Sequence, residues 1–249
     1  TLVSDLDDEF RERGLIAAST GNHGQSVAYA GREFDVPVVI CVPEDANPGK
    51  VRAMERLGAS IESHGSTFDE AREHAEGLAA EEGYRYVHSA NERELVAGVG
   101  TAGLEVVEEL PDVDVFFSPV GGGSSAAGYC LTVGELTEAE VVGVQSAAAP
   151  AMHRAWSEGR LDPHDRMETT AEGLATSVPF ALTTELLRER LDDFVLVEDS
   201  ALWDGVRRML AADHVLMEGA CATGVAAALD RGDELAGKTV VFPVSGRNL

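Results

Sequence analysis

Residues 15–31 read LIAASTGNHGQSVAYAG and join an apolar run to a stretch with helical spacing. A plain turn needs one Gly or Asn, but this joint contains six small or polar residues: Ser19, Thr20, Gly21, Asn22, His23 and Gly24. The first turn of a helix presents N–H groups and partial positive charge, and Ser and Thr add hydroxyl donors. The corner therefore predicts a site for a carboxylate. An ordinary helix N-cap by Ser, Thr or Asn is the alternative.

The rest of the chain alternates short apolar runs with helical patterns, which predicts an α/β fold with parallel, helix-flanked sheets. The expected strands are rich in β-branched residues, as buried parallel strands are, and cover 15–18, 36–42, 60–63, 85–88, 113–118, 141–145, 194–197 and 238–244. The expected helices cover 24–34, 49–57, 68–82, 92–109, 124–134, 201–211 and 219–229. Residues 150–180 form the least regular region.

A second corner follows the apolar run at 113–118 and reads PVGGGSSA over residues 119–126. Three glycines allow the backbone to turn its amides toward an anion. The loop is no Walker motif, because no Gly-Lys-Ser/Thr follows it. It does fit a loose G-x-G-x-x-A. A dinucleotide fold, however, requires an acid after the next strand, and Gln145 and Ser146 stand there. A compact phosphate monoester is therefore favoured over a dinucleotide, with a tight packing turn as the remaining alternative.

A third corner, Ser245-Gly246-Arg247-Asn248, follows the last expected strand and is equally compatible with a cap or a ligand contact. The seven histidines show no H-x-H or H-E-x-x-H spacing, so no metal site is expected. There is also no G-x-S-x-G elbow of a hydrolase.

The net charge of the chain excludes some classes of binding partner. Asp and Glu total 44 against 19 Lys and Arg, a formal net charge of −25. Such a field repels nucleic acid and anionic membranes and is typical of a halophilic surface. No apolar run is long enough to span a membrane. The three cysteines form neither a metal spacing nor a disulfide framework, which favours a reducing, cytoplasmic location.

The corners together resemble the motifs of fold-type II, tryptophan-synthase-β-like, pyridoxal-phosphate enzymes. Ser19–His23 resembles their S-x-G-N-H signature, and the glycine loop resembles their phosphate cup. Glu218-Gly219-Ala220-Cys221-Ala222 is similar to their E-G-A-G-A stretch, and Ser245–Asn248 to their S-G-G-N. Order and spacing hold from about residue 10 onward, and threonine/serine dehydratases (threonine ammonia-lyases) are the most similar subfamily. The resemblance implies a two-domain fold, with a small mobile domain at about 16–90 and a large cofactor-binding domain from 1–15 and 91–249.

The resemblance also implies roles for single residues. The substrate carboxylate would be bound by Ser19, Thr20, Gly21 and His23. The cofactor pyridoxal 5′-phosphate would be bound by Asn22 at its 3-hydroxyl, by Ser245 at its pyridine nitrogen, near its ring edge by Gly173, and at its phosphate by Gly121, Gly122, Gly123 and Ser124. Glu218 would lie close to the cofactor. The implied reaction is β-elimination from threonine or serine, which gives a 2-oxo acid and ammonia.

One family feature is missing from the sequence. The lysine that binds the cofactor covalently belongs just upstream of the first strand, and the only lysines are Lys50 and Lys238. We expect this lysine, the one catalytic residue that the resemblance implies, in a segment preceding Thr1. Rival functions are a β-replacement enzyme such as cysteine synthase, a threonine synthase, a non-catalytic ligand-binding or regulatory protein, and a nucleotide-binding α/β protein. The expected partner is a small amino acid, and similar enzymes suggest a homodimer.

Overall fold

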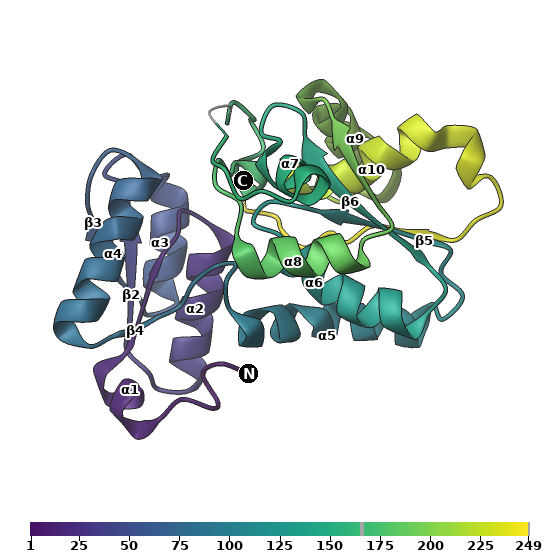
Figure 1. The fold of residues 1–249 in the computed structure, drawn as a ribbon. Coiled ribbons are helices and arrows are strands. Elements are labelled where there is room, and N and C mark those ends of the chain that lie inside the picture. The colour runs from purple at the N-terminus through teal and green to yellow at the C-terminus, as the bar shows by residue number, and fades with distance from the viewer. Residues whose placement is uncertain (165–166, 249) are drawn as a thin grey trace. The chain divides into compact units, whose positions relative to one another are not determined.

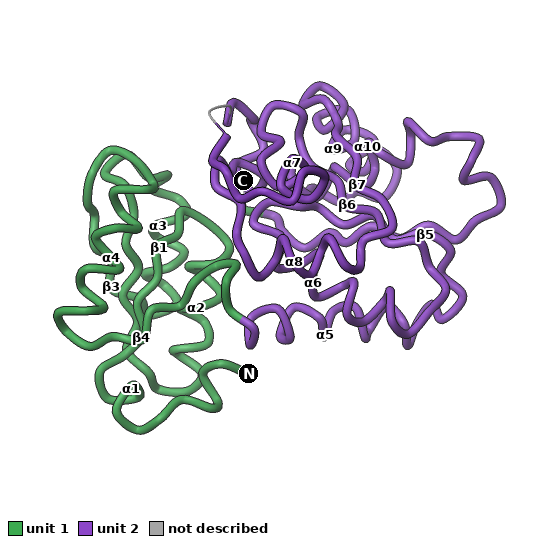
Figure 2. The backbone as a smooth tube through the Cα atoms, viewed as in Figure 1, with its two compact units in different colours: residues 1–92, 248 green, residues 93–247, 249 purple. Residues whose placement is uncertain are grey.

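The computed structural model describes residues 1–164 and 167–248 and divides the chain into two compact units. The first contains residues 1–92 together with Asn248, and the second contains residues 93–247 (Figure 2). Each unit has its own parallel four-stranded sheet, so the predicted α/β class with helix-flanked parallel sheets is confirmed.

The first unit alternates helices and strands in the order α1 (Asp8–Arg13), β1 (Leu15–Ala18), α2 (Asn22–Glu33), β2 (Val38–Val42), α3 (Pro48–Arg56), β3 (Ser60–Ser63), α4 (Phe68–Glu82) and β4 (Arg85–Tyr86). Its strand order is β3-β2-β1-β4. All four residues of β1 are buried, because neighbouring strands and helices on both faces enclose it. The chain leaves the carboxyl end of this central strand directly into the corner at Ser19.

Alternate side chains of this sheet face different helices. Ile16, Ala18 and Cys41 pack on Ala71 and Ala75 of α4. On the other face Gly24 of α2 lies close to Ile40 and to Met54 of α3, where a Cβ on the glycine would be 2.5 Å from the methionine sulfur. Glycine at position 24 therefore lets the start of α2 approach α3 closely.

The second unit begins with α5 (Arg93–Glu109), β5 (Val115–Pro119), α6 (Ser124–Tyr129), the π-helical turn η1 (Cys130–Gly134) and β6 (Glu140–Ser146). It continues with α7 (Ala151–Glu158), the 3-10 turn η2 (Glu172–Leu174), α8 (Ala181–Arg190), β7 (Asp193–Val197) and α9 (Asp199–Asp213). It ends with η3 (Gly219–Cys221), α10 (Ala222–Arg231), η4 (Gly232–Leu235) and β8 (Val240–Val241). The strand order is β7-β6-β5-β8, all parallel.

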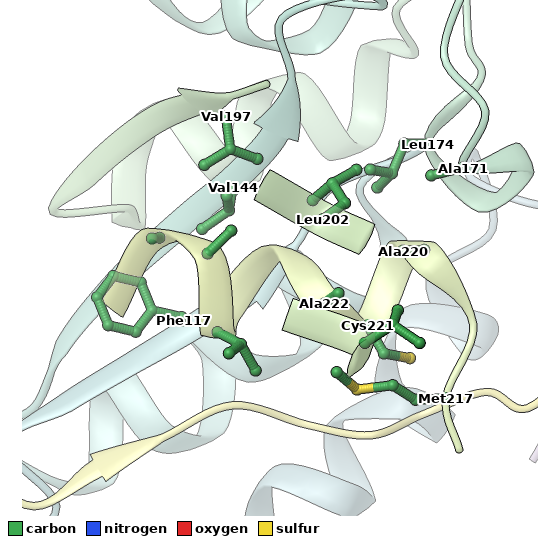
Figure 3. Close-up of a cluster of buried hydrophobic side chains, with 14 of the residues drawn as sticks. Phe117, Val144, Ala171, Leu174, Val197, Leu202, Met217, Ala220, Cys221 and Ala222 are labelled. Atoms are coloured by element: carbon green, nitrogen blue, oxygen red, sulfur yellow. The ribbon is translucent and has the colours of Figure 1, made fainter. Parts of the chain in front are cut away.

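Two apolar layers enclose this second sheet. Val115, Phe117 and Val144 point to one layer, which α9 and α10 cover together with Met217 and Cys221 (Figure 3). Phe116 and Val141 belong to the opposite layer. Helices α5, α6 and α8 cover the sheet on that side (Figure 1). Strands buried on both faces explain the continuous apolar runs of the sequence, and parallel pairing brings their carboxyl ends to one edge.

All eight predicted strands are present, although those expected at 36–42, 85–88, 113–118 and 238–244 are shorter in the structure. Helices α7 and α8 were not predicted. Helix α7 lies within the region 150–180, and its Ala151, Met152 and Ala155 are buried. Residues 1–15 were expected with the larger domain but belong to the first unit. The reason is local pairing: Leu15 N–H donates to the Pro37 carbonyl, and Arg85 N–H donates to the Gly14 carbonyl. Independent movement of the smaller domain stays a prediction.

Candidate active site

The corner after β1 is organised by the hydroxyl of Ser19. This buried oxygen accepts hydrogen bonds from the N–H groups of Gly21, at 3.2 Å, and Gly24, at 2.9 Å. Ser19 thus has the capping role that was the alternative interpretation of this corner, and it satisfies N–H groups at the start of α2. Only its hydroxyl proton remains to be donated to a ligand.

Thr20 and Asn22 follow at the same corner with different exposure. Thr20 is half-buried, and its hydroxyl has no hydrogen-bond partner among residues 1–164 and 167–248. Asn22 is exposed at the first position of α2. Gly21, just before the helix, has the extended backbone angle φ −155°. The corner therefore presents hydroxyl and N–H donors at a helix N-terminus, which is a chemistry that suits a carboxylate.

His23 is held by a backbone contact within the first unit. Its Nε2 lies 3.0 Å from the Val87 carbonyl oxygen, and a carbonyl can only accept, so Nε2 carries the proton. Burial lowers the pKa of His23, and nearby His88 lowers it further, although the bond to Val87 works in the opposite direction. The ring is therefore neutral near pH 7, and Nδ1 presents a lone pair. A neutral ring so placed cannot donate to a carboxylate, and the backbone N–H of His23 is the donor left for the predicted role.

The glycine turn of the second unit follows β5. Gly123 has φ +88°, a left-handed conformation that favours glycine, and a Cβ there would lie about 3 Å from Thr183, Leu187 and Met152. The Thr183 hydroxyl donates to the Gly122 carbonyl at 2.7 Å and fixes the turn. Ser124 and Ser125 open α6, and their hydroxyls have no hydrogen-bond partner in the described part of the chain.

Gly173 lies against this turn although it is 52 positions away from Gly121 in the sequence. A Cβ on Gly121 would be 2.2 Å from the Gly173 carbonyl oxygen, so the two backbones are in direct contact. A Cβ on Gly173 would in turn be 3.0 Å from the Ala220 side chain and 3.6 Å from Glu218 Oε1. The predicted cofactor-binding residues Gly121 and Gly173 are thereby brought together.

The turn after β8 completes this cluster. A Cβ on Gly246 would lie 2.4 Å from the carboxylate atoms of Glu218, and Glu218 N–H donates to the Gly246 carbonyl at 3.2 Å. Cys221 Sγ accepts the Gly246 N–H at 3.3 Å and lies 3.6 Å from the Ser245 hydroxyl oxygen. Ser245, Glu218, Gly173 and the glycine turn thus form one continuous surface region of the second unit, which we call the glycine-turn cluster.

The glycine-turn cluster fits a phosphorylated pyridine. The turn supplies backbone N–H groups, the helix start at α6 and two serine hydroxyls, which are the donors that a phosphate accepts. Ser245 supplies an exposed neutral hydroxyl that can donate to a ring nitrogen. The contact between Gly121 and Gly173 leaves no room for a larger side chain at position 121, which is the reason for a glycine there.

Sequence reasoning missed two contributors. Thr183 lies in α8 and contacts the glycine turn through a hydrogen bond that spans 61 positions. Cys221 was noted only as a departure from a glycine in the resembled motif, yet its sulfur contacts both Ser245 and Gly246. No local pattern around Thr183 could have identified it, because the contact depends on how α8 packs.

Comparison with known proteins identifies the family of this chain. Residues 1–246 match the family described as pyridoxal-phosphate dependent enzyme. The chain belongs to this family. The predicted family and its cofactor are thereby confirmed, whereas the role of each single residue stays a prediction.

Members of the pyridoxal-phosphate-dependent family include proteins much like this chain. An L-threonine ammonia-lyase of Thermotoga maritima is 38% identical over 99% of this chain and 62% of its own length. One of Geobacter sulfurreducens is 37% identical over 95% of this chain and 59% of its own length. The processed form of threonine deaminase isoform 2 from Solanum lycopersicum superposes with a TM-score of 0.95 at 28% identity, over 100% of this chain and 73% of that one. The chain thus spans about three fifths of the two ammonia-lyases.

Two further observations concern other classes of site. Among the described residues of this family member, no group of three or more His, Cys, Asp or Glu side chains is placed to hold a metal ion. In residues 1–164 and 167–248, none of the helices combines the length and the apolar character that a membrane crossing requires.

Proposed function

We propose that this protein catalyses pyridoxal-phosphate-dependent β-elimination from threonine or serine, which yields a 2-oxo acid and ammonia. Two relatives at 37–38% identity carry the name L-threonine ammonia-lyase. Residues 1–246, which match the family, include every predicted site residue. The observation that carries the proposal is the glycine-turn cluster, where Gly121, Gly173, Glu218 and Ser245 meet although they are far apart in the sequence.

When bound, pyridoxal phosphate supplies an electron sink for the α-carbon of the amino acid. Gly121, Gly122, Gly123 and Ser124 would hold its phosphate through backbone N–H groups and the Ser124 hydroxyl. Ser245 would donate its hydroxyl proton to the pyridine nitrogen. A neutral hydroxyl leaves that nitrogen unprotonated, which favours elimination over transamination. Gly173 would border the ring, and the 3-hydroxyl would contact Asn22.

The corner at Ser19 would bind the substrate carboxylate with the Ser19 and Thr20 hydroxyls and with N–H groups at the start of α2. Neutral His23 brings no positive charge to this corner, so the helix start and the hydroxyls must provide the attraction. Fixed N–H and hydroxyl dipoles can stabilise the charge of a carboxylate without having to reorganise when the ligand binds. We therefore expect affinity for an α-carboxylate without a requirement for an arginine or a lysine.

The predicted covalent lysine remains part of this proposal. Lys50 is buried in α3 of the first unit. Lys238 precedes β8 and therefore lies at the amino end of the second sheet, the end opposite the glycine turn. Neither lysine lies where the resemblance places the covalent one, upstream of the first strand, so the proposal assigns that role to a lysine outside residues 1–249. Borohydride reduction of the full-length protein with its cofactor would link the cofactor to this lysine. Peptide mass spectrometry would then identify the modified residue.

An assay of the full-length protein, including the segment that would carry the covalent lysine, with L-threonine and pyridoxal phosphate tests the activity. We expect 2-oxobutanoate and ammonia in equal amounts, and Gly121→Ala should abolish most of the product, whereas Gly77→Ala on exposed α4 should not. Formation of cysteine from O-acetylserine and sulfide, without 2-oxobutanoate, would favour the β-replacement alternative. Cofactor binding without turnover of either substrate would favour the ligand-binding alternative.

Three broader expectations also stay proposals. A homodimer is supported only by what is usual among similar enzymes. A cytoplasmic location is supported by Cys41, Cys130 and Cys221, which are all free and buried. A halophilic origin is supported by the net charge of −25.

A further inference from the structure

The carboxylate of Asp199 is the centre of a hydrogen-bond network in the second unit. Asp199 is the first residue of α9 and follows β7. Its Oδ1 accepts the Ser146 hydroxyl at 2.6 Å and the Thr169 hydroxyl at 2.9 Å. Its Oδ2 accepts the Thr170 N–H at 2.6 Å and the Thr170 hydroxyl at 2.9 Å. The Thr169 hydroxyl also lies 3.1 Å from Oδ2. Four donors thus surround the carboxylate, which is about the capacity of the group.

These donors come from two separate parts of the second unit. Ser146 is the last residue of β6 and is fully buried, and its hydroxyl oxygen also accepts the Ala148 N–H at 3.0 Å. Thr169 and Thr170 belong to the irregular segment 167–171, which directly precedes η2 and contains no helix or strand. Asp199 therefore ties this irregular segment to the carboxyl end of a central strand.

The tied segment runs directly into the glycine-turn cluster. Thr170 is followed by Ala171, which is buried, and then by η2, which contains Gly173. The Gly173 carbonyl contacts Gly121 at the start of the glycine turn. A shift at Thr170 would move Gly173, because only two residues separate them. The position of Gly173 against the glycine turn thus depends on the bonds that Asp199 accepts.

We propose that Asp199 is a positioning residue for cofactor binding, which holds Gly173 in place through Thr169 and Thr170. This inference rests on the proposed function, since it gives the glycine-turn cluster the cofactor as its ligand. Asp199 does not itself reach the cluster, so its effect passes through the segment 169–173. The hydrogen bonds that it accepts also lower its pKa despite partial burial, which keeps the carboxylate ionised as the four donors require.

The network contains its own spectroscopic reporter. Trp203 lies one turn further along α9, and its indole N–H donates to the Thr170 hydroxyl at 2.9 Å. In a Trp156→Phe background, where Trp203 is the single tryptophan, the emission therefore reports the position of Thr170 before any cofactor is added. Loss of the Asp199 carboxylate should shift this emission in the cofactor-free protein, while a purely global loss of stability would leave the folded-state emission unchanged.

The test uses 4′-deoxypyridoxine 5′-phosphate, which has no aldehyde and binds without a covalent lysine bond. Its dissociation constant is measured by fluorescence titration of the full chain at a temperature well below unfolding. We expect Asp199→Ala to weaken binding by about tenfold or more, and Asp199→Asn to lose less, because its amide oxygen can still accept the Thr170 N–H. Asp204→Ala is the matched control, since Asp204 is an exposed acid of the same helix whose ion pair is with Arg207.

The possible results of this titration distinguish a failure of the proposed function from a failure of the positioning role of Asp199. If the unchanged protein fails to bind the analogue, the proposed function is wrong and this inference falls with it. If the unchanged protein binds and Asp199→Ala binds within about twofold of it, the cofactor site stands and the positioning role is wrong. An equal loss in Asp204→Ala would also overturn the inference. Should Asp199→Ala not fold, Thr170→Val removes one donor and is expected to weaken binding in the same direction, with unchanged affinity counting against the role.

Discussion

The sulfur of Cys221 lies 3.6 Å from the hydroxyl oxygen of Ser245 and accepts the N–H of the next residue, Gly246, at 3.3 Å. A thiol at the start of α10 therefore holds the turn that would face the pyridine nitrogen. Burial raises the pKa of the Cys221 thiol, although the contacts with Ser245 and Gly246 work in the opposite direction, so the sulfur keeps its proton near neutral pH. The protonated sulfur can donate to Ser245 while it accepts from Gly246.

Replacing this thiol should loosen the Ser245 turn. We expect Cys221→Ala to lower the free energy of unfolding by about 1 kcal/mol, since it removes a buried group that has hydrogen bonds. Cys221→Ser should lose less, because a hydroxyl can make the same bonds. Urea unfolding of the cofactor-free protein measures both values. Cys130→Ser is the control for a buried cysteine elsewhere in this unit, and equal unfolding curves for Cys221→Ala and the unchanged protein would contradict the role.

The contact between Gly121 and Gly173 leads to a second prediction. A methyl group at position 121 would meet the Gly173 carbonyl at 2.2 Å, so one backbone segment must move. We expect Gly121→Ala to destabilise the protein by about 1–3 kcal/mol, the usual cost of overpacking. Gly77→Ala is the matched control, because a Cβ there meets nothing within 4 Å and alanine should stabilise α4 by about 0.5–1 kcal/mol. Thermal unfolding of both variants distinguishes crowding from a general glycine effect.

The neutral state of His23 predicts a pH dependence of stability. The pKa of His23 in the folded state is lowered from 6.5. Below pH 6.5, the unfolded chain therefore binds a proton at this residue that the native state does not bind. Stability that is fully present above pH 6.5 should therefore be lost as the pH falls from 6.5 toward the folded pKa. The pKa values of His88 and His153 are lowered by burial too, so they add to the same trend.

His23→Gln isolates the contribution of His23, since its amide can still donate to the Val87 carbonyl but does not titrate. Urea unfolding of both proteins is measured at about pH 7.5 and about pH 5.5. The loss of unfolding free energy between these values should be smaller in His23→Gln. An equal loss in the two proteins would show that His23 does not titrate abnormally. Comparing the two proteins cancels the effect of the carboxylates, which are common to both.

Some strands and helices could be predicted from local sequence patterns, and others could not. β1, β3 and α4 were predicted to the residue, because a buried apolar strand and a capped helix leave local signals; the cap of α4 is a reciprocal one between Thr67 and Glu70. The strand β8 was expected over 238–244 but is paired only at Val240 and Val241, since pairing depends on the neighbour β5 and not on apolar character alone.

Some residues of the candidate site could likewise be predicted from the sequence, and others could not. The glycine turn could be predicted because three glycines after a strand have few other uses. Asp199 and Thr183 could not, since their partners lie 53 and 61 positions away. In a chain with 44 acids, a single Asp after a strand is indistinguishable from a solvated surface residue until the fold places donors around it.

The net charge of −25 predicts dependence on salt. Repulsion between exposed carboxylates should destabilise the native state in dilute buffer, and added salt should screen it. We expect the melting temperature to rise steadily between about 0.1 M and about 2 M KCl, a range over which the screening length falls below about 3 Å. A melting temperature that is highest in dilute buffer would contradict the halophilic interpretation.

The claim on which the account depends is that the glycine turn at 121–123 holds the phosphate of the cofactor. Amide chemical shifts of the isotope-labelled chain, recorded while 4′-deoxypyridoxine 5′-phosphate is added, test it directly and need no catalysis. Within the second unit, we expect the largest changes at Gly121, Gly122, Gly123 and Ser124, with smaller ones at Gly173 and Ser245. Saturable changes that leave the amides of the glycine turn unmoved would contradict it.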